Sequence, residues 1–287
     1  MNNFIKRTIS GVGFAAIMLA AFLTNEYVFG AVMLFCLVVM MWEFLHITCG
    51  KEYRYSQILS ILAGATLFTL VYCYKMTWLE GRYVILSFVP VFILMINSLY
   101  VKDKSRFDRF ANLYTAILYI AVPWSVLNFA AFDAQEGGAF DGGLLLCFFG
   151  IIWGSDVGAY LFGITLGQKY GKKLFPSISP KKSWIGFWGG MFMAIAVAVV
   201  LYYMHLFPSV FASQTANVLN YAGLAIMLHV TGVYGDLIES QWKRHYEVKD
   251  SGSIIPGHGG LLDRFDSALI AIPMGVIYLV IEHVLHI

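Results

Sequence analysis

The residues best suited to chemistry in this chain lie in one polar stretch, residues 235–267, between two apolar segments. The stretch combines acidic and basic side chains with glycine-rich turns, in a chain that is 59% hydrophobic and only 13% charged. Charged groups are costly beside a hydrocarbon layer, so they are usually kept there for a function. We therefore interpret the stretch as a candidate active site, and an ordinary polar loop is the simpler alternative.

The first half of this stretch is suited to binding metal and phosphate if the preceding apolar helix continues through it. Four side chains would then share one face, at spacings of three, four and seven residues. They are Asp236, Glu239, Ser240 and Lys243, with Arg244 adjacent. A carboxylate and a hydroxyl one turn apart suit Mg²⁺ and its waters. The neighbouring basic pair suits phosphate oxygens.

The second half cannot be regular helix, because Pro256 is followed by Gly257, His258, Gly259 and Gly260. Glycines let backbone N–H groups approach an anion closely. Two carboxylates, Asp263 and Asp266, then flank Arg264 at the entry to the last apolar segment. A helix N-cap would account for one of the two aspartates but not for both.

A further acidic residue, Asp156, lies within an apolar segment, at membrane depth or just below it. It requires a partner, a cation or water, and a buried ion pair is the simpler alternative. Glycines recur nearby at about every fourth position, which is also typical of close helix packing. They are Gly154, Gly158, Gly163 and Gly167.

Two adjacent lysines, Lys181 and Lys182, lie between Ser179 and Ser183 just before another apolar segment. Lysines supply point charges, and a helix N-terminus offers N–H groups to an anion. The pattern predicts a phosphate site. A marker of membrane topology, or a contact to anionic lipid, is the alternative.

The composition predicts an all-α polytopic membrane protein, since membrane-spanning helices satisfy their own backbone hydrogen bonds. About nine segments are long enough to span a bilayer. They lie near residues 8–24, 27–48, 56–78, 83–100, 111–132, 143–164, 184–207, 217–240 and 267–286. The first is expected to be retained, and a cleaved signal peptide is the alternative. We expect one continuous membrane domain, with N-terminal helices over 1–142 and a catalytic region over 143–287.

Basic residues gather at the N-terminus and in the connections after the second, fourth, sixth and eighth segments. The positive-inside rule then places the N-terminus and the candidate site inside and the C-terminus outside. The connection after the third segment fits less well, because it carries Lys75 and Arg82. A net charge of +2 does not suggest nucleic acid, and the four cysteines form no CxxC pair typical of a zinc knuckle.

The run from Ser240 to Asp266 resembles the characteristic motif of the phosphatidate cytidylyltransferases, also called CDP-diacylglycerol synthases. The matching residues are Ser240, Lys243, Arg244, Lys249, Asp250, His258, Gly259, Gly260, Asp263, Arg264 and Asp266. The resemblance extends upstream to Asp156 and Tyr160, to 179–184 and to Gly235 and Asp236. It covers the C-terminal half, whereas the N-terminal half carries no diagnostic pattern.

The resemblance implies that CTP and phosphatidic acid react to give CDP-diacylglycerol and diphosphate, with Mg²⁺ and a second metal such as K⁺. It assigns Asp236, Asp263, Asp266 and, as a further candidate, Asp156 to metal. It assigns Lys243, Arg244 and Arg264 to the phosphates and Ser240 to hydrogen bonding. Expected substrate-binding residues are Ser179, Lys181, Lys182, Ser183, Lys249, His258, Gly259 and Gly260.

Two other functions also fit part of this pattern. A CTP-dependent lipid alcohol kinase would transfer the γ-phosphoryl group instead, and an ion-coupled transporter would use Asp156 and Asp236. Neither internal repeats nor matching broken segments favour a transporter. A bacterial inner membrane is the expected location, with membrane lipids as neighbours and no nucleic acid. Whether the protein forms a homodimer stays open.

Overall fold

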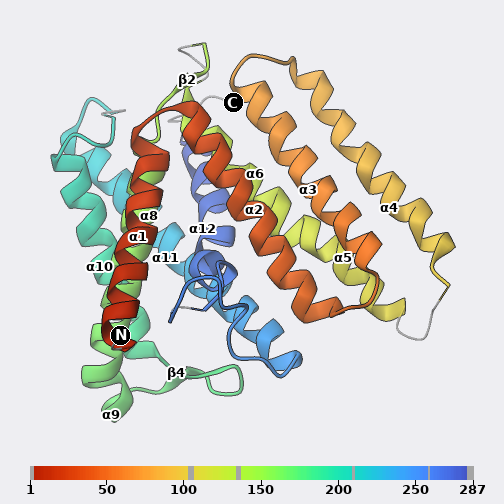
Figure 1. The fold of residues 1–287 in the computed structure, drawn as a ribbon. Helices are drawn as coiled ribbons and strands as arrows, with labels where there is room; N and C mark the ends of the chain where they lie inside the picture. The colour runs from red at the N-terminus through yellow and green to blue at the C-terminus, as the bar shows by residue number, and fades with distance from the viewer. Residues whose placement is uncertain (1–2, 103–106, 134–136, 209–210, 258, 283–287) are drawn as a thin grey trace. The chain divides into compact units, whose positions relative to one another are not determined.

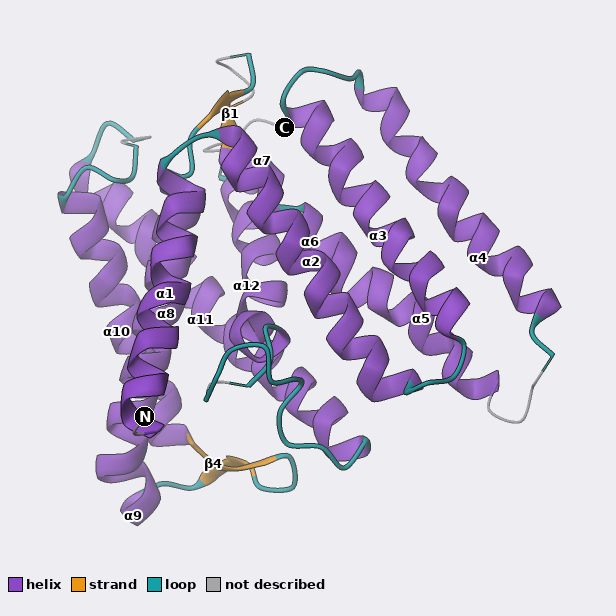
Figure 2. Ribbon diagram, viewed as in Figure 1, coloured by secondary structure: helices purple, strands orange, loops and turns teal. Residues whose placement is uncertain are grey.

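The computed structural model describes residues 3–102, 107–133, 137–208, 211–257 and 259–282. Almost all of the regular structure is helical, and the described strands form two short antiparallel hairpins, drawn orange in Figure 2. Eight helices of the described part are long and apolar enough to cross a membrane, and Thr8–Leu23 is a shorter apolar helix. This confirms the predicted all-α polytopic class.

The chain forms two compact units. Unit 1 contains Met1–Asp141 and His245–Phe265, and unit 2 contains Gly142–Arg244 and Asp266–Ile287. The polar stretch 235–267 is therefore divided between the two units.

Unit 1 is built mainly from helices that follow one another closely along the chain. In order they are α1 (Asn3–Leu23), α2 (Glu26–Cys49), α3 (Arg54–Lys75), the 3₁₀ helix η1 (Gly81–Ser87), α4 (Phe88–Tyr100), the 3₁₀ helix η2 (Phe107–Phe110), α5 (Ala111–Ala116), the π-helical η3 (Ile117–Ala121), α6 (Val122–Ser125) and α7 (Leu127–Ala131), followed by the hairpin β1 (Phe132–Asp133) and β2 (Ala139–Phe140). Short connections place α2, α3 and α4 next to one another, as Figure 1 shows.

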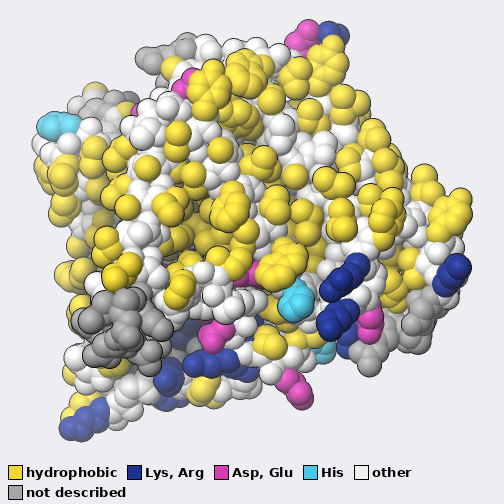
Figure 3. Space-filling view, viewed as in Figure 1, with side chains coloured by type: hydrophobic (Ala, Val, Ile, Leu, Met, Phe, Trp, Pro, Cys, Tyr) yellow, Lys and Arg dark blue, Asp and Glu magenta, His cyan; other side chains and the backbone are white. Residues whose placement is uncertain are grey.

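Helix α2 supplies much of the core of unit 1, because it is apolar around its whole circumference. Met33, Leu37 and Phe44 are among its buried side chains, and the Trp124 indole N–H donates to the Met33 carbonyl at 2.8 Å. Helix α4 differs, since only Leu94 of its residues is buried. The surface over α3 and α4 is accordingly mostly hydrophobic in Figure 3, as expected of lipid-facing helices.

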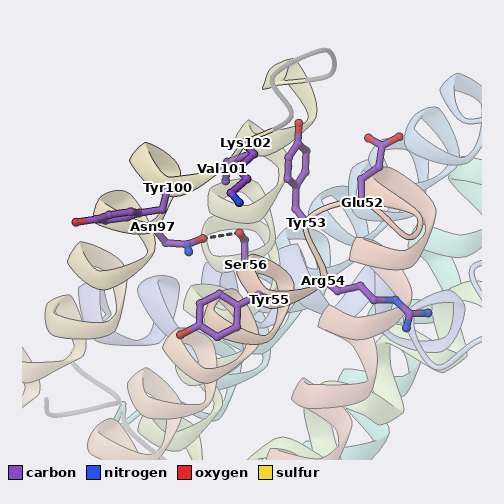
Figure 4. A pocket seen from close by; sticks show the side chains of 9 residues that line it. All are labelled: Glu52, Tyr53, Arg54, Tyr55, Ser56, Asn97, Tyr100, Val101 and Lys102. Carbon is purple, nitrogen blue, oxygen red and sulfur yellow. Dashed lines mark hydrogen bonds between the residues drawn. The ribbon is translucent and has the colours of Figure 1, made fainter.

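The basic α2–α3 connection lies at the same end of unit 1 as the last turn of α4. Together they line a cavity of about 400 Å³, and Arg54 and Lys102 are among its lining residues. Figure 4 shows the Ser56 hydroxyl there, donating to the Asn97 side-chain oxygen at 2.5 Å. The cavity contains none of the predicted site residues. The two basic connections that were predicted to share a side of the membrane thus meet within this unit.

Unit 2 contains the helices around the remaining motifs. In order they are α8 (Gly143–Phe162), the π-helical η4 (Gly163–Gly167), α9 (Gln168–Tyr170), the hairpin β3 (Lys173–Phe175) and β4 (Ser179–Ser183), α10 (Trp184–Tyr203), α11 (Gln214–His245, whose last residue is counted with unit 1) and α12 (Leu262–Ile281, which belongs to unit 2 from Asp266 onward). Helix α11 extends past Asp236 as predicted, and α12 begins five residues earlier than expected, which places Asp263 and Asp266 in its first turns.

Small residues let α8 and α10 pack closely, side by side (Figure 1). A Cβ on Gly158 would lie 2.8 Å from the Gly189 carbonyl oxygen, and one on Gly154 would lie 2.7 Å from Val197. Close packing therefore explains these two glycines without a ligand. Gly163 has nothing within 4 Å of its Cβ position and borders a cavity instead.

Candidate active site

Helix α11 presents its polar residues in line, as the spacing predicts. The Ser240 hydroxyl donates to Asp236 Oδ1 at 3.1 Å, one turn away. One turn further, Lys243 forms an ion pair with Glu239, whose side chain is almost completely buried. A buried carboxylate is costly unless it is paired, so this ion pair accounts for Glu239. Arg244 is exposed.

The two lysines before α10 occupy different positions although they are adjacent in sequence. Lys182 Nζ lies 2.7 Å from Asp236 Oδ2, which joins the predicted phosphate segment to the predicted metal segment. The Lys181 side chain is exposed, and its backbone carbonyl accepts from Gln168 Nε2 at 2.7 Å. Strand β4 causes this difference, because successive side chains of a strand point in opposite directions.

Ser183 is buried and forms the N-cap of α10, where its hydroxyl oxygen accepts from Gly186 N at 3.2 Å. This contact satisfies one of the N–H groups that a helix start leaves open. Ser179 is partly buried at the other end of β4. Ser183 therefore caps α10 and also lines a cavity of unit 2. Ser179 is not among the described residues that line this cavity.

A cavity of about 560 Å³ lies in unit 2 where these residues meet. Its polar lining includes Asp156, Lys181, Lys182 and Asp236, and its apolar lining includes Tyr160, Ile164, Leu174, Phe187 and Val233. Asp156 is exposed and borders this space, so the structure does not place it in a buried ion pair. An amphipathic cavity of this kind can hold a charged group at one part and a hydrocarbon group at the other.

Asp266 belongs to the same unit through the close approach of α12 to α11. A Cβ on Gly235 would lie 2.5 Å from the Asp266 carbonyl oxygen, so only glycine permits this packing. Asp266 Oδ1 accepts from Ser267 N at 2.7 Å, and the carboxylate interacts electrostatically with Asp236 and Asp156. Three predicted metal-binding aspartates are therefore close enough to one another for their charges to interact.

Carboxylates are the ligand type that a magnesium ion prefers in proteins. Within the described residues, no three His, Cys, Asp or Glu side chains form a complete metal site by themselves. Mg²⁺, however, usually binds through one or two carboxylates, while waters and substrate phosphates complete its coordination. Aspartates that repel one another are stabilised by a bound cation. Asp236 and Asp266 are the residues that would hold it.

The remaining motif residues lie in unit 1, in the segment that leads into α12. Asp263 Oδ2 accepts from Ser251 N, Ser251 Oγ and Gly260 N, at 2.8, 2.9 and 2.8 Å. Gly259 has a φ of 87°, a conformation that favours glycine. Lys249, Asp250 and Arg264 are exposed. The predicted residue His258 lies outside the described residues.

Two buried ionisable residues, Glu43 and His229, lie beside the motif residues but belong to none of the predicted motifs. Glu43, in α2 of unit 1, is fully buried and accepts from Leu261 N at 3.0 Å and from Leu262 N at 2.8 Å. In unit 2, buried His229 lies with Nδ1 2.6 Å from Ser155 Oγ, which joins α11 to α8 beside Asp156. A lone ionisable residue inside an apolar segment is the signal that could have found both.

The model of one protein family covers the whole polar stretch 235–267. The profile of the cytidylyltransferase family matches residues 5–282. The chain belongs to this family. The match confirms the predicted resemblance. It also covers the N-terminal half of the chain, where the sequence showed no diagnostic pattern.

Individual family members show the same relationship. The chain is 39% identical to the phosphatidate cytidylyltransferase of Staphylococcus aureus (strain COL) over 169 residues, which are 58% of this chain and 60% of the relative. It is 35% identical to the phosphatidate cytidylyltransferase of Bacillus subtilis (strain 168) over 191 residues, 66% of this chain and 65% of the relative. The aligned region spans less than two thirds of these relatives.

Proposed function

We propose that this protein is a phosphatidate cytidylyltransferase, which transfers CMP from CTP to phosphatidic acid and releases diphosphate. The observation that carries the proposal is the cavity of unit 2, where Lys182 meets Asp236 beside an apolar wall. Lysine and aspartate suit a nucleoside triphosphate with its cation. The apolar wall suits the hydrocarbon part of a lipid. The two similar bacterial proteins carry the same name.

The proposed reaction is a displacement at the α-phosphorus of CTP. A phosphate oxygen of phosphatidic acid attacks this atom, a new P–O bond forms, and the bond to the diphosphate oxygen breaks. Bound Mg²⁺ would offset charge on the triphosphate. Lys182 and Lys181 add positive charge at the same cavity, which favours binding of the triphosphate and the charge that develops on diphosphate. Ser240 orients the Asp236 carboxylate through its hydrogen bond.

The assignments of Asp263, Arg264, Lys249, His258, Gly259 and Gly260 to substrate or metal stay predictions from the motif, as does a second metal such as K⁺. We further propose a bacterial inner membrane as the location and leave a homodimer open.

The direct test is incubation of the purified protein with CTP labelled in the α- or γ-phosphate and with phosphatidic acid. We expect the α-label in CDP-diacylglycerol and the γ-label in diphosphate. Release of CDP together with transfer of the γ-label to a lipid alcohol would instead favour the CTP-dependent lipid kinase. Absence of any nucleotide turnover in the presence of Mg²⁺ would contradict both enzymatic functions.

We predict that charge-conserving exchanges at the end of α11 lower kcat/KM for CTP at least roughly tenfold, about 1.4 kcal/mol. The exchanges are Lys243→Arg and Arg244→Lys. An ammonium ion and a guanidinium fork do not contact phosphate or a buried carboxylate such as Glu239 in the same way. Steady-state kinetics with varied CTP measure the effect. Unchanged kinetics in both variants would move the proposed triphosphate site away from this pair, toward Lys181 and Lys182.

We predict that the N-terminus lies inside and the C-terminus outside, because basic connections alternate along the chain. A reporter fused after Ile287 should be active outside, and one inserted near Asp103 should be active inside. Both positions lie outside the described residues. An inside location for both reporters would show that the number of spans is even and that the loops are assigned to the wrong sides.

A further inference from the structure

The buried carboxylate of Glu43 lies against the motif loop of unit 1, although more than 200 positions separate them in sequence. Its two oxygens accept hydrogen bonds from two N–H groups at the start of α12: Leu261 N, just before the helix, donates to Oε1, and Leu262 N, in its first residue, donates to Oε2. A carboxylate at a helix N-terminus is stabilised by the helix dipole and by the open N–H groups. Glu43 therefore caps α12 from a different helix.

The same carboxylate also contacts the loop before the helix. The Ser251 hydroxyl lies 3.3 Å from Glu43 Oε2 and 2.9 Å from Asp263 Oδ2, so it joins the two acidic residues. Asp263 in turn accepts from Gly260 N. Glu43, Ser251 and Asp263 thus form one hydrogen-bonded cluster, which we call the loop anchor. It contacts the loop at two points, Ser251 and Gly260.

Two glycines make room for this carboxylate. A Cβ on Gly260 would lie 2.6 Å from Glu43 Oε2, and a Cβ on Gly252 would overlap Glu43 Oε1. Larger residues at either position would push the loop away from α2. The glycine-rich turn, which the sequence suggested as an anion-binding backbone, is therefore also shaped to fit a specific acidic side chain of the N-terminal half.

We infer that Glu43 is a positioning residue for Gly259 and Gly260 of the glycine-rich turn, and that it acts through the loop anchor rather than by touching substrate. The inference rests on the proposed function insofar as this turn binds substrate phosphate. A buried charge in a largely apolar helix is costly, and its two backbone N–H partners explain why it is kept. Helix α2, through Glu43, then helps to position the loop that leads into α12.

The first test is Glu43→Gln, which keeps the size of the side chain but leaves one acceptor oxygen where two backbone N–H groups require two. We expect kcat/KM for CTP to fall at least roughly tenfold. Glu43→Asp, which keeps both oxygens on a shorter side chain, should recover part of the loss. Glu80→Gln is the control, because Glu80 is an exposed glutamate of the same unit that pairs at the surface with Arg82, at 2.9 Å. It should behave as wild type.

Hydrogen exchange gives a measurement that does not depend on activity. The amides of Leu261 and Leu262 should exchange faster in Glu43→Gln, while amides within α2 keep their rates. Unchanged exchange at both amides would overturn the inference, even if the wild-type protein turned out to have another activity. Faster exchange with unchanged kinetics would overturn the positioning role and leave Glu43 as a structural cap.

Ser251→Ala keeps the test decisive if Glu43→Gln does not fold. This variant removes the hydroxyl that joins the two carboxylates and leaves both of them in place. We expect a several-fold lower kcat/KM, and an effect that is not additive with Glu43→Asp, since both changes act on one cluster. Additive effects would show that Glu43 does not act through the loop anchor.

Discussion

Asp236→Asn and Asp266→Asn should each lower turnover by about 10³-fold, equivalent to about 4 kcal/mol of transition-state stabilisation. Asparagine keeps the size of the side chain and removes its charge. Asp236 contacts Lys182 and Ser240, and its charge interacts with that of Asp266. Under the proposed function, losing either carboxylate removes a proposed ligand of Mg²⁺ and leaves nearby positive charge without its partner. The measurement is kcat with saturating CTP and phosphatidic acid.

The control for this prediction is Asp108→Asn, which changes an exposed aspartate in η2 of unit 1. It should retain wild-type turnover. All variants should elute from size exclusion in detergent as the wild type does. Turnover within a few-fold of wild type for Asp236→Asn or Asp266→Asn would show that these aspartates serve only the helix packing.

Asp263→Asn can be interpreted when the same turnover assay is combined with hydrogen exchange. The motif predicts a metal ligand at this position, whereas the structure gives Asp263 Oδ2 three hydrogen bonds from the loop. A metal ligand should lose activity while the loop stays protected from hydrogen exchange. A loop-holding residue should lose protection at Ser251 N and Gly260 N together with activity.

Lys182→Ala should lower kcat/KM for CTP at least roughly 100-fold, while Lys181→Ala should cost less than tenfold. The two lysines are adjacent and line the same cavity, but Lys182 contacts Asp236 and Lys181 is exposed. If the pair only marks topology or contacts anionic lipid, both variants should have equal effects, because the two charges are then equivalent. Steady-state kinetics with varied CTP distinguish these cases.

Lys182→Arg is the matched charge-conserving variant. Its guanidinium group keeps the positive charge but cannot reproduce a compact ammonium contact 2.7 Å from Asp236 Oδ2. We expect partial recovery, between the alanine variant and the wild type. Complete recovery would show that only the charge matters at this position.

The sequence by itself determined the class of this protein and the position of most of its helices. Long apolar runs in a bilayer must form helices, since their backbone groups have no water to bind. The three- and four-residue spacing after Asp236 was also sufficient to predict that Asp236 and Ser240 share a face, because helix geometry is local. The family motif followed from residue order alone.

Only the tertiary structure decided which of these residues meet. The contact between Lys182 and Asp236 joins two segments that no local spacing relates. The different environments of Lys181 and Lys182 follow from the direction of one short strand, and the division of the polar stretch between two units follows from packing. Glu43 is the clearest case, since its role depends on hydrogen bonds to residues more than 200 positions away. A lone charge in an apolar segment can mark such a residue, but its partners depend on how helices pack, and a single sequence contains no local signal for which residues those are.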